Sequence, residues 1–251
     1  MTPVRILSHK RDGGAGTAGA EHGFSLIEVA VVLFIIVLLL GSILVPLSTQ
    51  VEQRQISDTQ KTLDEIREAL IGFTLANGYL PCPDTSTNGS ENVTAGACTT
   101  ITGGVAIGRL PHLNLGLGNS DLWSNRFTYV VNAVYAQRSP ATPFTLSAVG
   151  NDVQICATSA CVAAAKLSTT AVFAVISHGK NGLGAVNYAT NATNPASSSA
   201  DEQENYDNND ANIVSRIRFT GGAAASEFDD IVIWMSKYTL FNRMVSAGKL
   251  P

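Results

Sequence analysis

Charged side chains are scarce in this sequence. They make up 14% of the 251 residues, well below the usual quarter. The formal net charge is −4, so the chain lacks the basic surplus that non-specific binding to nucleic acid requires. No internal repeat occurs. The length predicts one full domain with appendages, or two small domains, and the charge predicts no nucleic-acid partner.

The motifs of common hydrolases and nucleotide-binding enzymes are also missing. Neither a Gly-x-Ser-x-Gly elbow nor a P-loop occurs. Ser177 and His178 are adjacent, but neighbouring side chains on a strand point to opposite faces. If strand alternation holds, Asp229 and Asp230 also face apart. We therefore predict no catalytic residues and a chain that is not an enzyme.

Cysteine is limited to four residues, Cys82, Cys98, Cys156 and Cys161. No Cys-x-x-Cys pair occurs, and the four histidines are not at ligand spacing, which argues against zinc. The even number fits two disulfides, with the Cys82–Cys98 region closed into a loop. Four buried free thiols are the open alternative.

A long apolar run, FSLIEVAVVLFIIVLLLGSILV, fills residues 24–45. As a helix it would measure about 33 Å, enough to cross a bilayer core of about 30 Å. Arg5, Lys10 and Arg11 precede the run, which predicts a cytoplasmic leader and an exported C-terminal part. The run is longer than the apolar region of a cleaved secretory signal, and no small-x-small cleavage site follows it. The sequence thus predicts a transmembrane helix over 24–45.

Glu28 interrupts this apolar run. A carboxylate in a bilayer costs on the order of 2.5–3.5 kcal/mol, so a residue of this kind needs a partner. Its place near the start of the run leaves partial snorkelling to the interface as an alternative.

The segment Gly23-Phe24-Ser25-Leu26-Ile27-Glu28 resembles the processing site of type IV pilins and type II secretion pseudopilins. The resemblance implies that prepilin peptidase cleaves between Gly23 and Phe24 and methylates the new Phe24 amine. It also implies that Glu28 pairs with the N-terminal amine of a neighbouring subunit. A buried carboxylate and a buried ammonium are each costly alone and tolerable together.

Three later segments extend the resemblance. Residues 121–127 (DLWSNRF) resemble the Asp-Pro-Trp-Gly-Asn-x-Tyr stretch of major pseudopilins, and 177–182 (SHGKNG) resemble their Ser-x-Gly-x-Asp-Gly turn. Residues 228–234 (FDDIVIW) resemble their Asp-Asp-Ile strand. The resemblance also raises calcium, which major pseudopilins bind in a C-terminal loop. Hard oxygen donors gather here in Glu204, Asp207, Asn209, Asp210 and Asn212, but we favour a solvated polar loop, and no metal ligand or cofactor is assigned.

The fold class predicted is α+β: a long N-terminal transmembrane-plus-stalk helix packed on a mainly antiparallel β-sheet, as in pilins. Apolar residues at helical spacing make 51–77 an amphipathic stalk, and Asn77-Gly78 predicts its end. Strands are expected at 127–133, 144–149, 171–177, 213–219 and 230–235, and a final helix at 237–247. The predicted domains are a leader (1–23), the long helix (24–78) and an exported β-rich domain (79–251).

These patterns predict a structural subunit of a type IV pilus or a type II secretion pseudopilus, and the mature length favours a minor pilin. The partners that the resemblance implies are prepilin peptidase, other pilin or pseudopilin subunits, the inner-membrane assembly platform and membrane lipid. The expected location is the bacterial inner membrane, with a single span and a periplasmic C-terminal domain, and afterwards a filament. The alternative is a membrane-anchored periplasmic binding protein or enzyme that does not polymerise.

Overall fold

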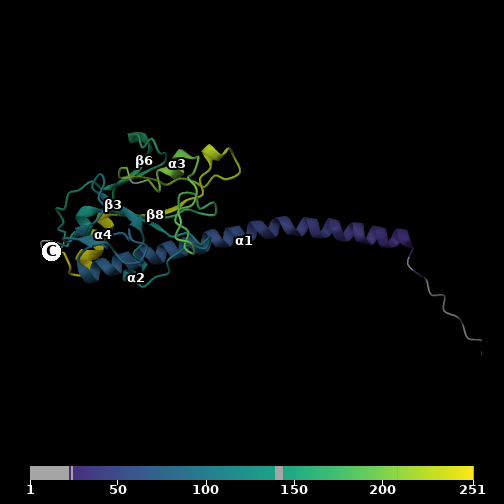
Figure 1. Cartoon of the computed structure of the whole chain (residues 1–251), viewed down its shortest axis with the longest axis horizontal. Helices are drawn as coiled ribbons and strands as arrows, with labels where there is room; N and C mark the ends of the chain where they lie inside the picture. The colour runs from purple at the N-terminus through teal and green to yellow at the C-terminus, as the bar shows by residue number, and fades with distance from the viewer. Residues whose placement is uncertain (1–22, 24, 139–143, 208, 251) are drawn as a thin grey trace, which may run out of the picture. The chain divides into compact units, whose positions relative to one another are not determined.

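The computed structural model describes residues 23, 25–138, 144–207 and 209–250, without the side chains of 42–48. The chain divides into two compact units, Met1–Gln50 and Val51–Pro251, which are treated separately below (Figure 1). Phe24 and the predicted leader, apart from Gly23, lie outside the described residues.

The first helix, α1, runs from Leu26 to Asn77. At its C-terminal end Gly78 adopts φ +83°, and its N–H donates to the Thr74 carbonyl, which closes the last turn. The predicted fold class is wrong about this element, because no helix of the described residues is apolar over a length that would cross a membrane.

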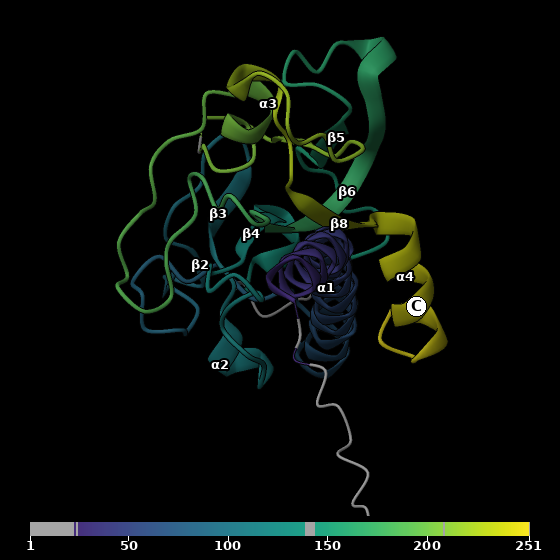
Figure 2. The same ribbon diagram turned by 90° about the vertical axis from the view of Figure 1, so that its right-hand side faces the viewer.

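The second unit is α+β, with a mainly antiparallel six-stranded sheet. The strand order is β3-β4-β6-β5-β7, and β8 pairs with β6; only β5 and β7 are parallel. Figure 2 shows β8 and β4 beside the part of α1 that belongs to this unit, with α4 on one side and α2 on the other. The sheet strands are β3 (Val105–Arg109), β4 (Thr128–Asn132), β5 (Val153–Cys156), β6 (Lys166–Ser177), β7 (Asn212–Val214) and β8 (Ile231–Ser236).

Shorter elements complete this unit. Strands β1 (Val93–Thr94) and β2 (Ala97–Cys98) form a separate hairpin. The remaining α-helices are α2 (His112–Leu115), α3 (Ala200–Gln203) and α4 (Lys237–Ser246). Single 3₁₀ turns lie at Ala133–Ala136, Ala163–Ala165 and Ala224–Ser226.

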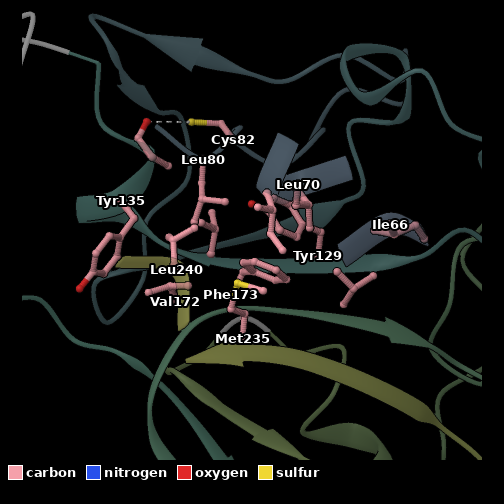
Figure 3. Close-up of a cluster of buried hydrophobic side chains, with 14 of the residues drawn as sticks. Ile66, Leu70, Leu80, Cys82, Tyr129, Tyr135, Val172, Phe173, Met235 and Leu240 are labelled. Carbon is pink, nitrogen blue, oxygen red and sulfur yellow. Dashed lines mark hydrogen bonds between the residues drawn. The ribbon is translucent and has the colours of Figure 1, made fainter. Parts of the chain in front are cut away.

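Two apolar clusters lie on the two faces of the sheet. The larger joins Leu63, Ile66 and Leu70 of α1 to Phe173 of β6 and Leu240 of α4, all with exposed fractions of 0–1% (Figure 3). The smaller contains Val130, Ile155 and Ile176 with their neighbours. Alternation along β8 explains the division, because Ile233 and Met235 join the first cluster while Val232 and Trp234 pack against the second.

The strand predictions succeed where the apolar runs are strong. Strands β4, β6 and β8 confirm 127–133, 171–177 and 230–235, and α4 confirms the helix at 237–247. The prediction at 213–219 is right only for its first residues, since β7 ends at Val214. No strand forms at 144–149, where Phe144 instead packs against Tyr135 and Phe241 in the core.

The structure confirms the prediction of two disulfides. Cys82 pairs with Cys98, and Cys156 pairs with Cys161, so no described cysteine is free. The first disulfide ties the segment after α1 to β2 in the large cluster, where Cys82 is fully buried. The second closes a short loop after β5.

Candidate functional site

The predicted processing and assembly residues lie at the start of α1. Gly23 is exposed, and a Cβ added there would meet nothing within 4 Å. The Glu28 N–H donates to both the Ser25 carbonyl (3.0 Å) and the Ser25 Oγ (3.2 Å), so Ser25 caps the first turn. Ser-x-x-Glu is the pattern of a capping box, a signal that sequence reasoning missed. Glu28 is exposed in this first turn, where the helix dipole also stabilises a carboxylate.

Large apolar side chains follow on every side of the helix. All of those from Leu26 to Leu40 have exposed fractions between 44% and 90%. A contiguous exposed apolar surface of this kind marks a site of association, because leaving it in water is unfavourable.

A second candidate site lies inside the β-rich unit. The side chains of Glu202, Asp229 and Asp230 are all buried, and each offers an oxygen within 4.8 Å of the others. Glu202 comes from α3, and the two aspartates come from the residues just before β8. Because Asp229 and Asp230 precede the strand, alternation does not separate them, and the expectation that they face apart is wrong.

Neutral donors surround these carboxylates. Glu202 accepts from the Asn181 Nδ2 (3.0 Å), the Asp229 N–H (3.1 Å) and the Ser197 Oγ (2.6 Å). Asp230 accepts from the Asn205 Nδ2 at 2.7 Å. Asp229 Oδ2 accepts the Asn181 N–H at 2.8 Å, whereas Asp229 Oδ1 has no partner among the described residues. The cluster is thus held by hydrogen bonds from neutral donors.

The proximity of the three acids is reflected in Asp229. Burial raises the pKa of its carboxyl to about 7, and the neighbouring charges of Asp230 and Glu202 act in the same direction. His178 is also wholly buried; its Nε2 lies 2.8 Å from Thr128 Oγ1 and its Nδ1 lies 3.6 Å from Asp230 Oδ1. The cluster therefore favours either a proton on Asp229 or a hard cation among the carboxylate oxygens.

The segment 177–182 shapes one wall of this cluster. Gly179 has φ +58°, and a Cβ there would lie 2.4 Å from the Asp229 carbonyl oxygen. Only glycine fits without displacing that backbone. The glycine therefore allows the Ser-His-Gly-Lys-Asn-Gly segment to contact the Phe-Asp-Asp-Ile segment, which lies far away in the sequence.

The polar loop considered for calcium gathers no comparable set. The Asn209 Nδ2 donates to Asp207 and the Asn212 Nδ2 donates to Asp210, so these pairs satisfy each other within the loop. Burial and the charges of Asp207 and Asp210 raise the pKa of Glu204 to about 7. Among the described residues, the only group of three or more acidic, histidine or cysteine side chains placed to hold one ion is Glu202, Asp229 and Asp230.

An ion-pair group lies beside this cluster. Glu52 of α1 pairs with Lys180 (3.1 Å) and with Arg218, and together they lower the pKa of the Glu52 carboxyl. With Asp229 and Glu227 these residues line a hollow of about 340 Å³. Glu52 thus connects the start of the second unit to the two segments that hold the carboxylates.

Comparison of the chain with protein-family models, with curated proteins and with solved structures finds no match.

Proposed function

We propose that this chain is a structural subunit of a pilus-like filament, either a type IV pilus or a type II secretion pseudopilus, and not an enzyme. The observation that carries the proposal is the exposed apolar surface of 26–40, which follows directly on Gly23 and the capped turn of Glu28. Packed against the same surface of other subunits, these side chains would leave water. In that apolar surrounding Glu28 would pair with the amine of a neighbouring subunit.

The proposal includes partners and a location. Prepilin peptidase would remove residues 1–23, and an assembly platform at the bacterial inner membrane would feed the mature chain into the filament. The two disulfides support a domain outside the cytoplasm, since disulfides persist in oxidising compartments. The apolar clusters and the carboxylate group would then stabilise the domain displayed on the filament.

Processing gives the first test. Co-expression of the full chain with a prepilin peptidase should yield a product that starts at a methylated Phe24, as read by intact-mass and N-terminal peptide measurements. Gly23→Val should abolish this product, because a branched side chain replaces the small residue at the cleaved bond. Glu21→Gln is the matched control and should be processed normally. Unprocessed wild-type chain in the presence of active peptidase would count against the proposal.

Assembly gives the second test. Glu28→Leu should be processed but should be depleted at least about tenfold from sheared filaments, since the loss of one buried charge pair exceeds 1.4 kcal/mol. Glu65→Leu removes an exposed carboxylate from the second half of the same helix and should be incorporated normally. Equal incorporation of both variants would contradict the role of Glu28.

A further inference from the structure

Three side chains from the ends of three elements meet around one carboxylate in the β-rich unit. Asn132 is the last residue of β4, Asp152 precedes β5, and Lys237 is the first residue of α4. The strand register brings them together, because a chain neighbour of each of the three pairs with residue 171 or 173 of β6. Asp152 thus lies close to residues that are 20 and 85 positions away in the sequence.

The carboxylate of Asp152 bridges an amide and an amine. Its Oδ1 accepts from the Asn132 Nδ2 at 3.0 Å, and its Oδ2 accepts from the Lys237 Nζ at 2.7 Å. The amide and the amine are therefore held side by side, at the two oxygens of one carboxyl group. Asn132 is fully buried, Asp152 is 6% exposed and the side chain of Lys237 is 23% exposed, so most of the bridge is shielded from water.

The side-chain carbonyl of Asn132 has a hydrogen-bond donor of its own. The Val134 N–H donates to the Asn132 Oδ1 at 3.0 Å, as the cap of the 3₁₀ turn Ala133–Ala136. A fixed backbone N–H at this place stabilises the negative charge that forms on a carbonyl oxygen when a nucleophile adds to its carbon. The Asn132 amide is thus held in position and polarised for attack.

We propose that the Lys237 Nζ forms an amide bond with the Asn132 side chain and so cross-links β4 to α4. A lysine amine is a nucleophile once it has lost its proton, and a bridging carboxyl group can carry that proton. Two protons pass in turn from Nζ through the Asp152 carboxyl to Nδ2, the Nζ–Cγ bond forms, the Cγ–Nδ2 bond breaks, and ammonium leaves. Asp152 ends as the carboxylate that it was, and nothing is oxidised or reduced.

Asp152 has the position that this proton transfer requires. Its hydrogen bond raises the pKa of Lys237, so the amine is protonated at rest and gives a proton to Asp152 before it attacks. Asp152 also lines an open hollow of about 430 Å³ with Gly150 and Asn151, through which the ammonium can leave. The cross-link does not depend on the filament proposal, since it uses neither Gly23, Glu28 nor residues 26–40.

Mass spectrometry of the purified full chain in detergent tests the bond. The folded wild-type chain, held until its mass no longer changes, should be lighter by about 17 Da than its sequence with two disulfides, because one ammonia is lost. Trypsin should then release 127–138 joined to 219–243, since a modified Lys237 is not cleaved. A folded wild-type chain of full mass would overturn the proposal. A loss of about 18 Da, with the link at Asp152, would show that Asn132 is not the acceptor.

Variants test the role of each group. Lys237→Arg keeps a cation beside Asp152 but lacks the amine, so it should retain its full mass. Asp152→Asn keeps the shape but cannot carry the proton, and it should form the link at least about tenfold more slowly. Cooperative unfolding in urea checks the fold of each variant. Equal rates in Asp152→Asn and wild type would contradict the role of Asp152, and if that variant is misfolded the wild-type mass and Lys237→Arg decide.

The chain also contains a matched control pair. The Lys166 Nζ lies 3.2 Å from the Gln154 Oε1, and no carboxylate bridges this amine and amide among the described residues. Tryptic peptides should show Lys166 and Gln154 unlinked. A link formed there as readily as at Lys237 would mean that proximity alone suffices and that the bridging carboxylate has no part in the reaction.

Discussion

The two halves of α1 have similar backbones and opposite surroundings. From Leu26 to Leu40 the large apolar side chains are exposed on all sides. From Val51 to Asn77 only one face is apolar, and Leu63, Ile66 and Leu70 on that face are fully buried by the sheet and α4. The second half is covered by other elements of its own unit, whereas the large apolar side chains of the first half are exposed. The buried face of the second half helps to fold its own domain, and the exposed surface of the first half is the part that we propose packs against other subunits.

The largest expected effect is on the free energy of unfolding, which should respond very differently to a substitution in each half of α1. Leu70→Ala should lower the free energy of unfolding of the β-rich unit by about 2–5 kcal/mol, because it leaves a cavity beside Phe173 and Leu240. The matched variant Leu33→Ala, at a side chain 57% exposed, should change it by less than about 0.5 kcal/mol. Urea denaturation followed by tryptophan fluorescence measures both. Similar losses in the two variants would remove the contrast between the halves.

The disulfides stabilise the β-rich unit, whose sheet and helix α4 pack against the buried half of α1. Replacing Cys82 and Cys98 by alanine should cost about 3 kcal/mol, since that disulfide closes 16 residues of chain. Replacing Cys156 and Cys161, which are 5 residues apart, should cost about 2 kcal/mol. Thermal unfolding of the two double variants gives the order. A larger loss for the shorter loop would contradict the chain-entropy argument.

The carboxylate cluster makes the stability of the β-rich unit, which contains the buried half of α1, depend on pH. The pKa of Asp229 is raised to about 7, above its unfolded value of about 3.9, so the folded state binds the extra proton between these values. The contribution of Asp229 to the free energy of unfolding is therefore fully present below about pH 4. It is lost as the pH rises through about 7. Asp229→Asn should gain on the order of 2 kcal/mol relative to wild type at pH 8, with little difference at pH 4.

Urea denaturation at the two pH values measures this gain. The control is Asp58→Asn, at an exposed carboxylate of α1 that pairs with Lys61, which should show no comparable dependence. Adding calcium at pH 8 gives a further comparison, because a cation bound among the three carboxylates should stabilise wild type more than Asp229→Asn. A variant that is less stable than wild type at pH 8 without calcium would contradict the assignment of the raised pKa.

The smallest expected effect concerns Glu52, at the start of the buried half. Glu52→Gln removes its pairs with Lys180 and Arg218 and should cost about 1 kcal/mol or less, as is usual for partly exposed ion pairs. Because these pairs lower the pKa of Glu52, their contribution is present above about pH 4.5 and is lost as the pH falls below it. The effect should shrink in 1 M salt, while Glu65→Gln should show no salt-dependent change.

The sequence predicted most of the elements formed by strong local patterns. Strands β4, β6 and β8 follow from apolar runs, and α4 follows from its spacing and the glycine after it. Strands β3 and β5 were missed because glycine and polar residues interrupt them, and they form only by pairing with β4 and β6. The segment 144–149 forms no strand: Phe144 packs in the core, whereas Leu146 and Val149 are exposed. The transmembrane helix was inferred from the length of the apolar run, whereas no helix of the described residues is apolar over a length that would cross a membrane.

The site was predictable only in its parts. The sequence singled out four cysteines and the segments 177–182 and 228–234, but it left the pairing of the cysteines open and did not predict that the two segments meet. Glu202 lies 27 residues before Asp229, with the whole polar loop and β7 between them, so no local spacing could connect the two. His178 lies at the start of the turn that the resemblance implied, but the burial of its side chain beside Asp230 was not predicted. Long-range burial of polar groups leaves little trace in local composition.

The core beneath the sheet joins the beginning of the β-rich unit to its end. During synthesis it can therefore be completed only after the last residues of the chain have been made. Leu70 is made about 170 residues before Leu240, with which it shares a cluster. At 5–20 residues per second, the apolar face of the helix waits on the order of 10–30 s for its last partners. A chain interrupted before residue 231 lacks β8 and α4, so the part of that face which packs against them stays uncovered. A finished molecule therefore differs from a truncated one in whether β8 and α4 cover this apolar face.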